Sequence, residues 1–255
     1  MNMTTQIIPV EFNKDKLEQL VNRKFGELKI GVETQDKIMN TYLKIVEDND
    51  NSNGNGKNKK DKEEKKFNYV YLHNCRVGLL NSMIGAYDGK DAALAFRAGL
   101  LHDVGKTAVR DQTVYNADNF TTKDRAKMRL HVPYTVNMIH SAFPREASII
   151  LFHHYFQNES YPTEVMIKEL LEEINMDGFS EKKAKNYALD LALADCYDAL
   201  VTRRNDKFEF IITPENSKEH MLDAYPDHPK LITKLYDKGI FGIDYLTLLG
   251  FDNGE

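Results

Sequence analysis

Apolar residues recur every three or four positions along most of the chain, and this spacing is typical of amphipathic α-helices. Leu17 and Val21 begin the pattern, which predicts helical structure over 13–47 with a break between Gly26 and Gly31. Further helices are predicted over 67–86, 91–102, 121–141, 144–154, 162–175 and 180–202, with two or three short ones within 214–250 and a short extended piece at 207–213. The chain shows neither a sequence repeat nor strands alternating with helices, so the predicted class is all-α, a helical bundle.

Polar residues at the expected helix ends support these boundaries. Thr121 and Thr122 offer side-chain oxygens that can cap a helix start, and Ser180 can do the same for the last long helix. Pro133 falls inside the 121–141 pattern. It is expected to kink or restart that helix, because proline lacks the backbone donor that a helix interior requires.

One segment departs from the helical pattern. Residues 47–66, EDNDNSNGNGKNKKDKEEKK, contain no apolar side chain, so they are predicted to form a flexible low-complexity loop. The lysines of this loop could attract an anion, but acidic residues are mixed among them, and a plain linker explains the segment better. The loop divides the chain into an N-terminal helical segment, 1–46, which is expected to pack on the bundle, and a larger part, 67–255.

Composition narrows the class of protein. The chain has 255 residues, of which 42% are hydrophobic, and a net charge of −5, so it can bury a core and does not favour polymeric nucleic acid. No apolar run approaches the ~18 residues of a membrane span, and the first residues lack a signal-peptide pattern. Cys75 and Cys196 lie within expected helices and are predicted to be core residues rather than a disulfide. We therefore expect a cytoplasmic protein without a membrane partner.

Several polar residues occupy positions where the helical pattern places core residues. His73 continues the stripe of Val70 and Val77, and a lone histidine on such a face is usually a core residue bonded to a backbone carbonyl. Asp195 and Asp198 stand one turn apart on an otherwise apolar face. Two such carboxylates repel each other unless a cation or a proton lies between them.

The stretch GLLHDVGK, residues 99–106, ends an apolar helix on a histidine and an aspartate. A buried carboxylate is costly unless it is paired or metal-bound. By itself the stretch admits two interpretations. In one, Asp103 caps the following turn, His102 lies at a partly exposed helix end and Lys106 is an ion-pair partner. In the other, His102 and Asp103 are metal ligands.

Three more histidines interrupt apolar segments: His131 in MRLHVPYTVNMI, and His153 and His154 after ASIILF. Adjacent residues inside a helix point ~100° apart, but at a helix end the backbone departs from that geometry and both can reach one ion. A bundle can bury so many polar groups from five expected helices only if something neutralises them. Two divalent cations sharing one carboxylate would do so, and mixed imidazole and carboxylate ligands suit Fe, Mn, Zn, Ni or Co rather than Mg or Ca.

The order of these residues resembles the HD superfamily of metal-dependent phosphohydrolases, and within it the HD-GYP cyclic-dinucleotide phosphodiesterases. The resemblance covers about residues 67–215 and is carried by the segments HDVGK, HHYFQNESYP and ADCYDALVTRRNDK. It implies an HD-domain helical bundle with a dinuclear metal site in its core. It also makes residues 67–255 the catalytic domain.

The resemblance further implies a role for each polar residue. One metal would be bound by His73, His102, Asp103 and Asp195, and the second by Asp103, His131, His153 and His154, with Asp103 as the bridge. Lys106 would hold the scissile phosphate, while Arg204 and Lys207 would contact phosphate or base. Asp198 would orient the region of Asp195 from behind. The implied cofactors are two divalent transition-metal ions, with Fe or Mn favoured.

The chain departs from the family pattern at several positions. Ser160 precedes Tyr161 where the family has a glycine, and the loop that contains them is one residue shorter. Tyr155 stands in place of a glutamate and Thr135 in place of a glycine, and these departures bear on substrate recognition. Tyr69 occupies the position where some members carry a glutamate that helps to bind a third metal, which favours two metals here.

The function expected from the resemblance is a phosphodiesterase that hydrolyses a cyclic dinucleotide second messenger, cyclic di-GMP, to the linear dinucleotide or GMP. In the family, a hydroxide held between the metals attacks phosphorus. One alternative is an HD nucleotidase or phosphohydrolase that acts on another nucleotide. Another is a non-catalytic signalling module that binds a nucleotide. The sequence leaves open a homodimer or a signalling partner protein.

Overall fold

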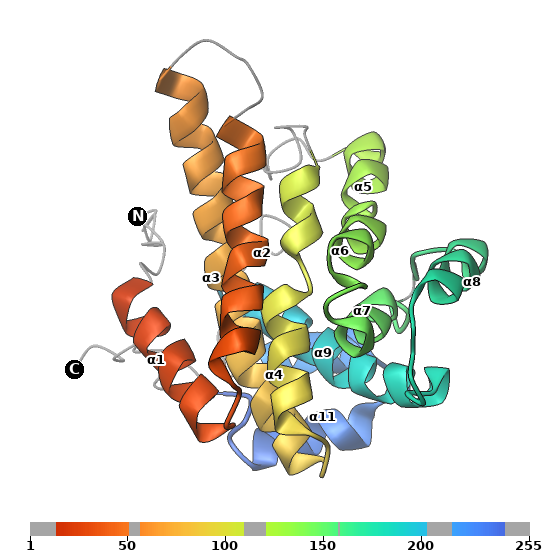
Figure 1. Cartoon of the computed structure of the whole chain (residues 1–255). Helices are drawn as coiled ribbons and strands as arrows, with labels where there is room; N and C mark the ends of the chain where they lie inside the picture. Colours follow the sequence, from red (N-terminus) through yellow and green to blue (C-terminus); the bar gives the residue numbers. More distant parts are fainter. Residues whose placement is uncertain (1–13, 51–56, 110–120, 158, 203–215, 243–255) are drawn as a thin grey trace, which may run out of the picture.

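A computed structural model of the chain describes residues 14–50, 57–109, 121–157, 159–202 and 216–242 (Figure 1). All regular structure within these residues is helical, which confirms the predicted all-α class. The elements in chain order are α1 (Lys14–Glu27), α2 (Val32–Asp50), α3 (Lys57–Tyr87), α4 (Ala92–Leu101), the 3-10 helix η1 (Val104–Ala108), α5 (Thr122–Met128), α6 (His131–Ile139), α7 (Pro144–Leu151), α8 (Glu164–Glu173), α9 (Glu181–Thr202), α10 (Ser217–Ala224) and α11 (Pro229–Asp237).

The helix predicted over 121–141 is two helices, α5 and α6. Thr121 starts α5 as predicted: its hydroxyl accepts a hydrogen bond from the amide of Asp124, whose carboxylate accepts from the Thr121 amide in return. The chain restarts as α6 at His131. Pro133 lies in the first turn of α6, where its missing N–H would have no helical acceptor, so the proline marks the restart.

Helical backbone occupies both ends of the segment predicted as a flexible loop. The helix α2 runs on to Asp50 and α3 begins at Lys57, so the prediction of a loop over the whole of 47–66 was wrong. Lysine and glutamate are good helix formers even without apolar neighbours, and each end continues a helix that is packed against the bundle elsewhere. The extended piece predicted at 207–213 lies outside the residues that the structure describes.

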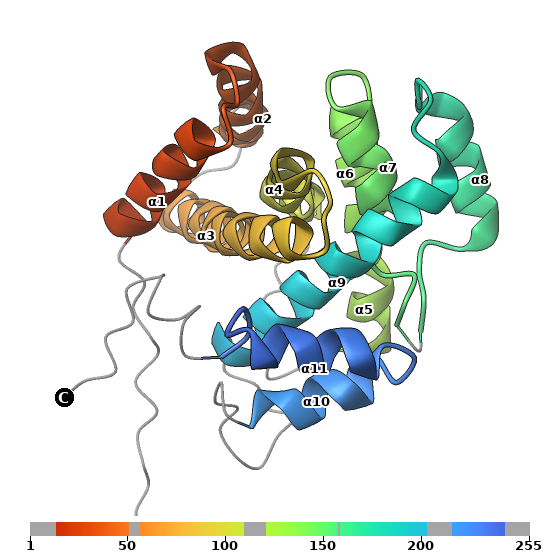
Figure 2. The same ribbon diagram turned by 90° about the horizontal axis from the view of Figure 1, so that it is seen from below.

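The core is built around α3, α4, α7 and α9. The helix α3 packs against α1, α2, α4 and α9, and α7 packs against α6 and α9 (Figures 1 and 2). Gly78 and Gly99 face each other where α3 and α4 cross, because a Cβ on Gly99 would lie only 2.6 Å from the Gly78 Cα. Because α1 and α2 both contact α3, these N-terminal helices lie on the bundle, as expected for the segment 1–46.

The two cysteines and His73 lie within or against the core, as expected. No disulfide joins Cys75 to Cys196, and the first is buried while the second is half-buried. Among the helices in the described ranges, none has both the length and the hydropathy needed to cross a bilayer. The stripe of Val70, His73 and Val77 is completely buried, so His73 does lie among core residues.

Candidate metal centre

His102 and Asp103 lie at the junction between α4 and η1. Both residues are 0% exposed, so His102 is not a partly exposed helix end. Asp103 occupies the N-cap position of η1 but its side chain makes no capping hydrogen bond, which removes the other ordinary role for its carboxylate. Lys106 does form the predicted ion pair, through a close contact between its ammonium and Asp103 Oδ2. The other oxygen, Oδ1, is buried without a hydrogen-bond partner among the described residues.

The position of this junction depends on a close contact between η1 and α6. The Gly105 amide donates a 2.9 Å hydrogen bond to Thr135 Oγ1, and the Thr135 hydroxyl donates a 3.1 Å hydrogen bond to the His102 carbonyl. A Cβ on Gly105 would lie 2.2 Å from the His131 carbonyl oxygen, so only glycine fits there. Thr135, which departs from the family pattern, thus joins the HD turn to the helix that carries His131.

His73, His102, Asp103 and Asp195 form the first of two clusters. The potential ligand atoms of these residues, from α3, the HD junction and α9, all lie within 4.8 Å of one another. The Nε2 atom of His73 is 3.0 Å from Asp195 Oδ1 and 3.4 Å from Asp103 Oδ2. His102 Nε2 lies 3.6 Å from the same Asp195 oxygen. The structure therefore brings together the four residues that the resemblance implies for one metal.

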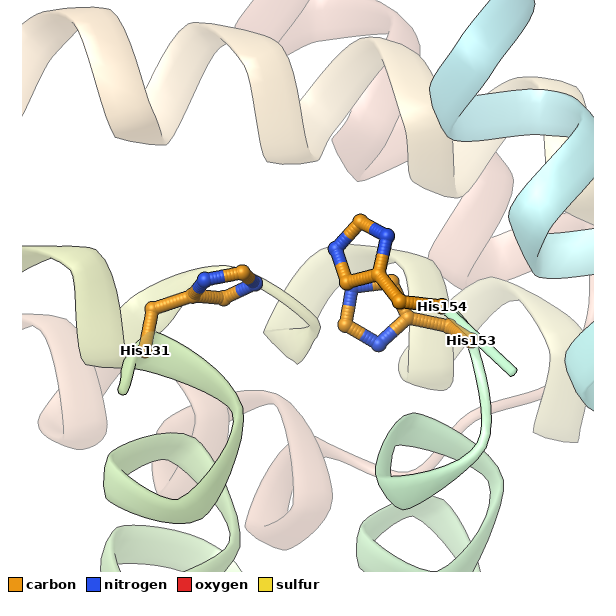
Figure 3. Close-up of side chains that lie close together, drawn as sticks. All are labelled: His131, His153 and His154. Carbon is orange, nitrogen blue, oxygen red and sulfur yellow. The ribbon is translucent and has the colours of Figure 1, made fainter. Parts of the chain in front are cut away.

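The second cluster consists of His131, His153 and His154. Their ligand atoms also lie within 4.8 Å of one another, and all three residues are buried. Figure 3 shows the His131 ring extending toward the other two from the opposite side. The helix α7 ends at Leu151, three residues earlier than predicted, so His153 and His154 lie in the turn that follows it. This departure from helical geometry lets adjacent histidines converge, with ring centroids 3.8 Å apart.

Hydrogen bonds at Nδ1 orient four of the five histidine rings. His102, His131 and His153 each contact the carbonyl three residues earlier, at 2.8, 2.7 and 2.6 Å. His73 Nδ1 instead contacts Asp198 Oδ2 at 2.7 Å. Because Nδ1–H is the donor in each case, these contacts select the tautomer whose Nε2 lone pair points into the cluster. His154 differs, because its ring stacks on Tyr161 with centroids 4.3 Å apart.

The interior-facing atoms of the two clusters are short of hydrogen-bond partners. Within the described part of the chain, no partner is found for His102 Nε2, Asp103 Oδ1, His131 Nε2, His153 Nε2 or either ring nitrogen of His154. His131 Nε2 and Asp103 Oδ1 are 3.2 Å apart yet not in hydrogen-bond geometry. Two lone pairs that face each other in a buried site repel unless a cation lies between them, so these residues fit a metal ion.

Burial and charge set the protonation states that metal binding requires. Burial lowers the pKa of His131 to about 4 and that of His153 to about 3, so both rings are neutral at pH 7. Burial alone would raise the pKa of Asp103, but His102, Lys106 and His131 outweigh it and hold that pKa well below its usual range. The second cluster therefore offers neutral imidazoles beside the ionised Asp103 carboxylate, whereas burial lowers the pKa of His102 but Asp103 and Asp195 raise it overall. Imidazole and carboxylate together are the donor set of transition metals.

Asp198 has a different partner from the one expected. It was predicted to orient the Asp195 region, but its carboxylate contacts His73 and accepts two hydrogen bonds from Arg76, at 2.7 and 2.9 Å. Arg76 was missed from the sequence, although its place three residues after His73 on a buried helix was a usable signal. The Arg76 charge, after the opposing effect of burial, lowers the pKa of Asp198, which keeps it an acceptor for His73.

Of the three residues predicted to contact substrate, the structure describes only Lys106. Lys106 lies at the first cluster with a side chain 11% exposed. Arg204 and Lys207 fall outside the described residues. Tyr69 and Tyr155, which replace glutamates of the family pattern, are exposed on the surface.

Comparison with protein families agrees with this geometry. A family model described as the HD domain matches residues 70–200, which is more than half of the chain and spans both clusters. The chain belongs to the HD-domain family. HD membership supports the helical bundle, binding of divalent metals and the activity of a metal-dependent phosphohydrolase. Comparisons with curated proteins and with solved structures gave no match.

Proposed function

We propose that this HD domain is a dinuclear phosphodiesterase that hydrolyses a cyclic dinucleotide, cyclic di-GMP, to the linear dinucleotide or GMP. The observation that carries the proposal is the position of the Asp103 carboxylate between the two clusters. Its Oδ1 atom is 3.2 Å from His131 Nε2, and its Oδ2 atom is 3.4 Å from the Nε2 atoms of His73 and His102. One carboxylate that offers an oxygen to each cluster is the arrangement that a bridging ligand requires.

The proposed ligands are the seven residues of the two clusters. Divalent ions held there would lower the pKa of a water molecule and neutralise charge on a phosphoryl group. His73, His102, Asp103 and Asp195 would hold one ion, and His131, His153 and His154, with Asp103, the other. Fe or Mn suits this mixture of imidazole and carboxylate donors.

Lys106 is the proposed phosphate-binding residue of the described part. Its ammonium lies against Asp103 Oδ2, and its side chain retains some exposure, so it borders both the cluster and solvent. An ammonium in that place would offset negative charge that develops on the phosphoryl oxygens. Arg204 and Lys207 remain proposed contacts to phosphate or base, on the resemblance alone.

A second candidate is a nucleotidase that acts on a smaller nucleotide. It is favoured by the loop after His154, which covers one side of the second cluster. Tyr161 stacks on the His154 ring, and the Arg129 guanidinium lies 5.3 Å from the Tyr161 ring centroid. Arg129 also pairs with Glu159 of the same loop, so the loop is held against the start of α6. A covered cluster favours a compact substrate over a bulky one.

Metal content and turnover test these candidates together. Wild-type protein should be purified anaerobically, analysed for metal, and assayed with cyclic di-GMP and with a panel of mononucleotides. We expect about two ions per chain and turnover of the cyclic dinucleotide. The isosteric variant Asp103→Asn should lose metal and turnover, while Asp36→Asn on the exposed face of α2 should retain both.

The possible outcomes of this experiment distinguish the candidate functions from one another. Circular dichroism of the Asp103→Asn variant separates loss of metal from loss of fold. Release of phosphate from mononucleotides without cleavage of any cyclic dinucleotide would support the nucleotidase. If the protein binds a nucleotide but takes up no metal, both the phosphodiesterase and the nucleotidase proposals are overturned. A non-catalytic binding module is then favoured.

A further inference from the structure

Tyr42 lies on α2, which precedes the residues matched by the HD family. Its side chain is completely buried, as is that of Ile38 one turn earlier, and α2 packs against both α3 and η1. Figure 1 shows α2 next to α3, and the two helices are in contact. This N-terminal helix therefore reaches the elements that carry His73 and the HD junction.

The Tyr42 hydroxyl joins the two helices that carry His73 and His102. It donates a hydrogen bond to the Leu100 carbonyl of α4 and accepts a 2.8 Å hydrogen bond from the Asn74 side-chain amide of α3. Asn74 is the residue after His73, and Leu100 lies two residues before His102. The ring of Tyr42 also packs edge-on against Tyr71, with centroids 5.2 Å apart, which restricts the movement of the hydroxyl.

The helices α3 and α4 pack closely, and hydrogen bonds on either side of their closest backbone approach fix how they cross. The two helices touch at Gly78 and Gly99, where no side chain lies between the backbones. Further from the cluster, the Asn81 amide donates a 2.7 Å hydrogen bond to the Ala95 carbonyl. Tyr42 links the same two helices on the other side of the glycine contact, which is the side of His73 and His102.

We propose that α2 is part of the support of the metal centre and that Tyr42 is a positioning residue for His73 and His102. The inference rests on the proposed metal centre. Metal–ligand distances must hold to within ~0.2 Å. A small change in how α3 and α4 cross would therefore move the Nε2 atoms of His73 and His102 too far from a shared metal ion. The variant Tyr42→Phe would leave the Asn74 amide and the Leu100 carbonyl buried without that partner.

The test compares Tyr42→Phe with Tyr187→Phe. Tyr187 is also buried, and its hydroxyl accepts a 2.8 Å hydrogen bond from the Asp91 backbone amide, which links α9 to the end of α4 opposite His102. Mn²⁺ affinity is measured by competition with a chelator, and the unfolding midpoint is measured on the chelator-treated proteins. Both variants should unfold more easily, but only Tyr42→Phe should weaken Mn²⁺ binding, by roughly tenfold or more.

The outcomes separate this inference from the proposed function. Equal Mn²⁺ affinity in wild type and Tyr42→Phe would overturn the positioning role, as would equal weakening in Tyr187→Phe. Wild-type protein that binds no Mn²⁺, Fe²⁺ or Co²⁺ would overturn the metal centre and the positioning role together. If Tyr42→Phe does not fold, Asn74→Ala removes the α3 side of the link, and retention of full Mn²⁺ affinity by that variant would contradict the inference.

Discussion

Substitution of Gly105 by alanine tests the contact that brings Asp103 to His131. A Cβ at this position would lie 2.2 Å from the His131 carbonyl oxygen, 2.5 Å from the Thr135 amide nitrogen and 2.7 Å from Thr135 Oγ1. Two of these atoms belong to the α6 backbone and cannot rotate away. The methyl group can therefore be accommodated only if η1 and α6 move apart.

The size of that movement follows from ordinary contact distances. Non-bonded atoms approach to about 3.5 Å, so η1 and α6 must separate by about 1 Å. Overpacking of this kind costs about 1–3 kcal/mol, which lowers the melting temperature of a chain of this length by roughly 2–12 °C. The same shift is several times the ~0.2 Å tolerance of a metal ligand. We therefore expect Gly105→Ala to lose metal from the second cluster.

The assay is metal content after reconstitution, together with the melting temperature in chelator. Gly26→Ala is the matched control, because a Cβ on Gly26 of α1 meets nothing within 4 Å. That variant should load metal normally and melt at the wild-type temperature or slightly above it. A Gly105→Ala protein that loads and melts like wild type would refute the argument that this glycine is required for the approach of α6.

Three further predictions concern the orientation and protonation of the ligands. The variant Asp198→Asn should weaken metal binding by roughly 10- to 100-fold in a chelator competition, because the bond that orients His73 is replaced by a weaker one. Removal of the stacked ring in Tyr161→Leu should release His154, lowering the metal content from about two ions to about one per chain. Chelator-treated protein should lose stability as the pH falls from about 6.5 to about 4, because unfolded histidine binds protons in this window while folded His131, with a pKa of about 4, does not. The contribution of His131 is about 3 kcal/mol, measurable by denaturant unfolding at a series of pH values.

Each of these predictions has a contradicting result. Unchanged metal affinity in Asp198→Asn would show that the His73 ring is oriented by packing alone. Full metal content in Tyr161→Leu would remove the role of the stack. Stability of the chelator-treated protein that stays constant or rises between pH 6.5 and 4 would mean that protonation of the buried histidines is not the dominant change. The opposite effect of His102, whose pKa is raised by Asp103 and Asp195 against the effect of burial, would then prevail.

Much of the helical fold could be predicted from the sequence, because helix formation depends on residues three and four positions apart. The stripe of Val70, His73 and Val77 predicted a buried helical face, and Thr121 and Pro133 marked helix starts correctly. The prediction of a loop at 47–66 was wrong at both ends of the segment. A lack of apolar residues shows that a segment makes no core contact, but lysine and glutamate can still form a helix there.

The candidate ligands could also be identified from the sequence, since buried histidines and aspartates are conspicuous on apolar faces. Only the tertiary structure decided how they group. It placed one oxygen of Asp103 toward His131 and the other toward His73 and His102, and it assigned Asp198 to His73 and Arg76.

The physical reason is the range of the interactions involved. Helical periodicity and capping act within one or two turns, so the sequence by itself determined which faces are buried and which polar groups are carried into the core. The packing of η1 on α6 and of Tyr42 between α3 and α4 joins residues 30 to 58 positions apart in the chain. Contacts of that range leave no periodic pattern, so only the folded chain determines the distances on which a metal centre depends.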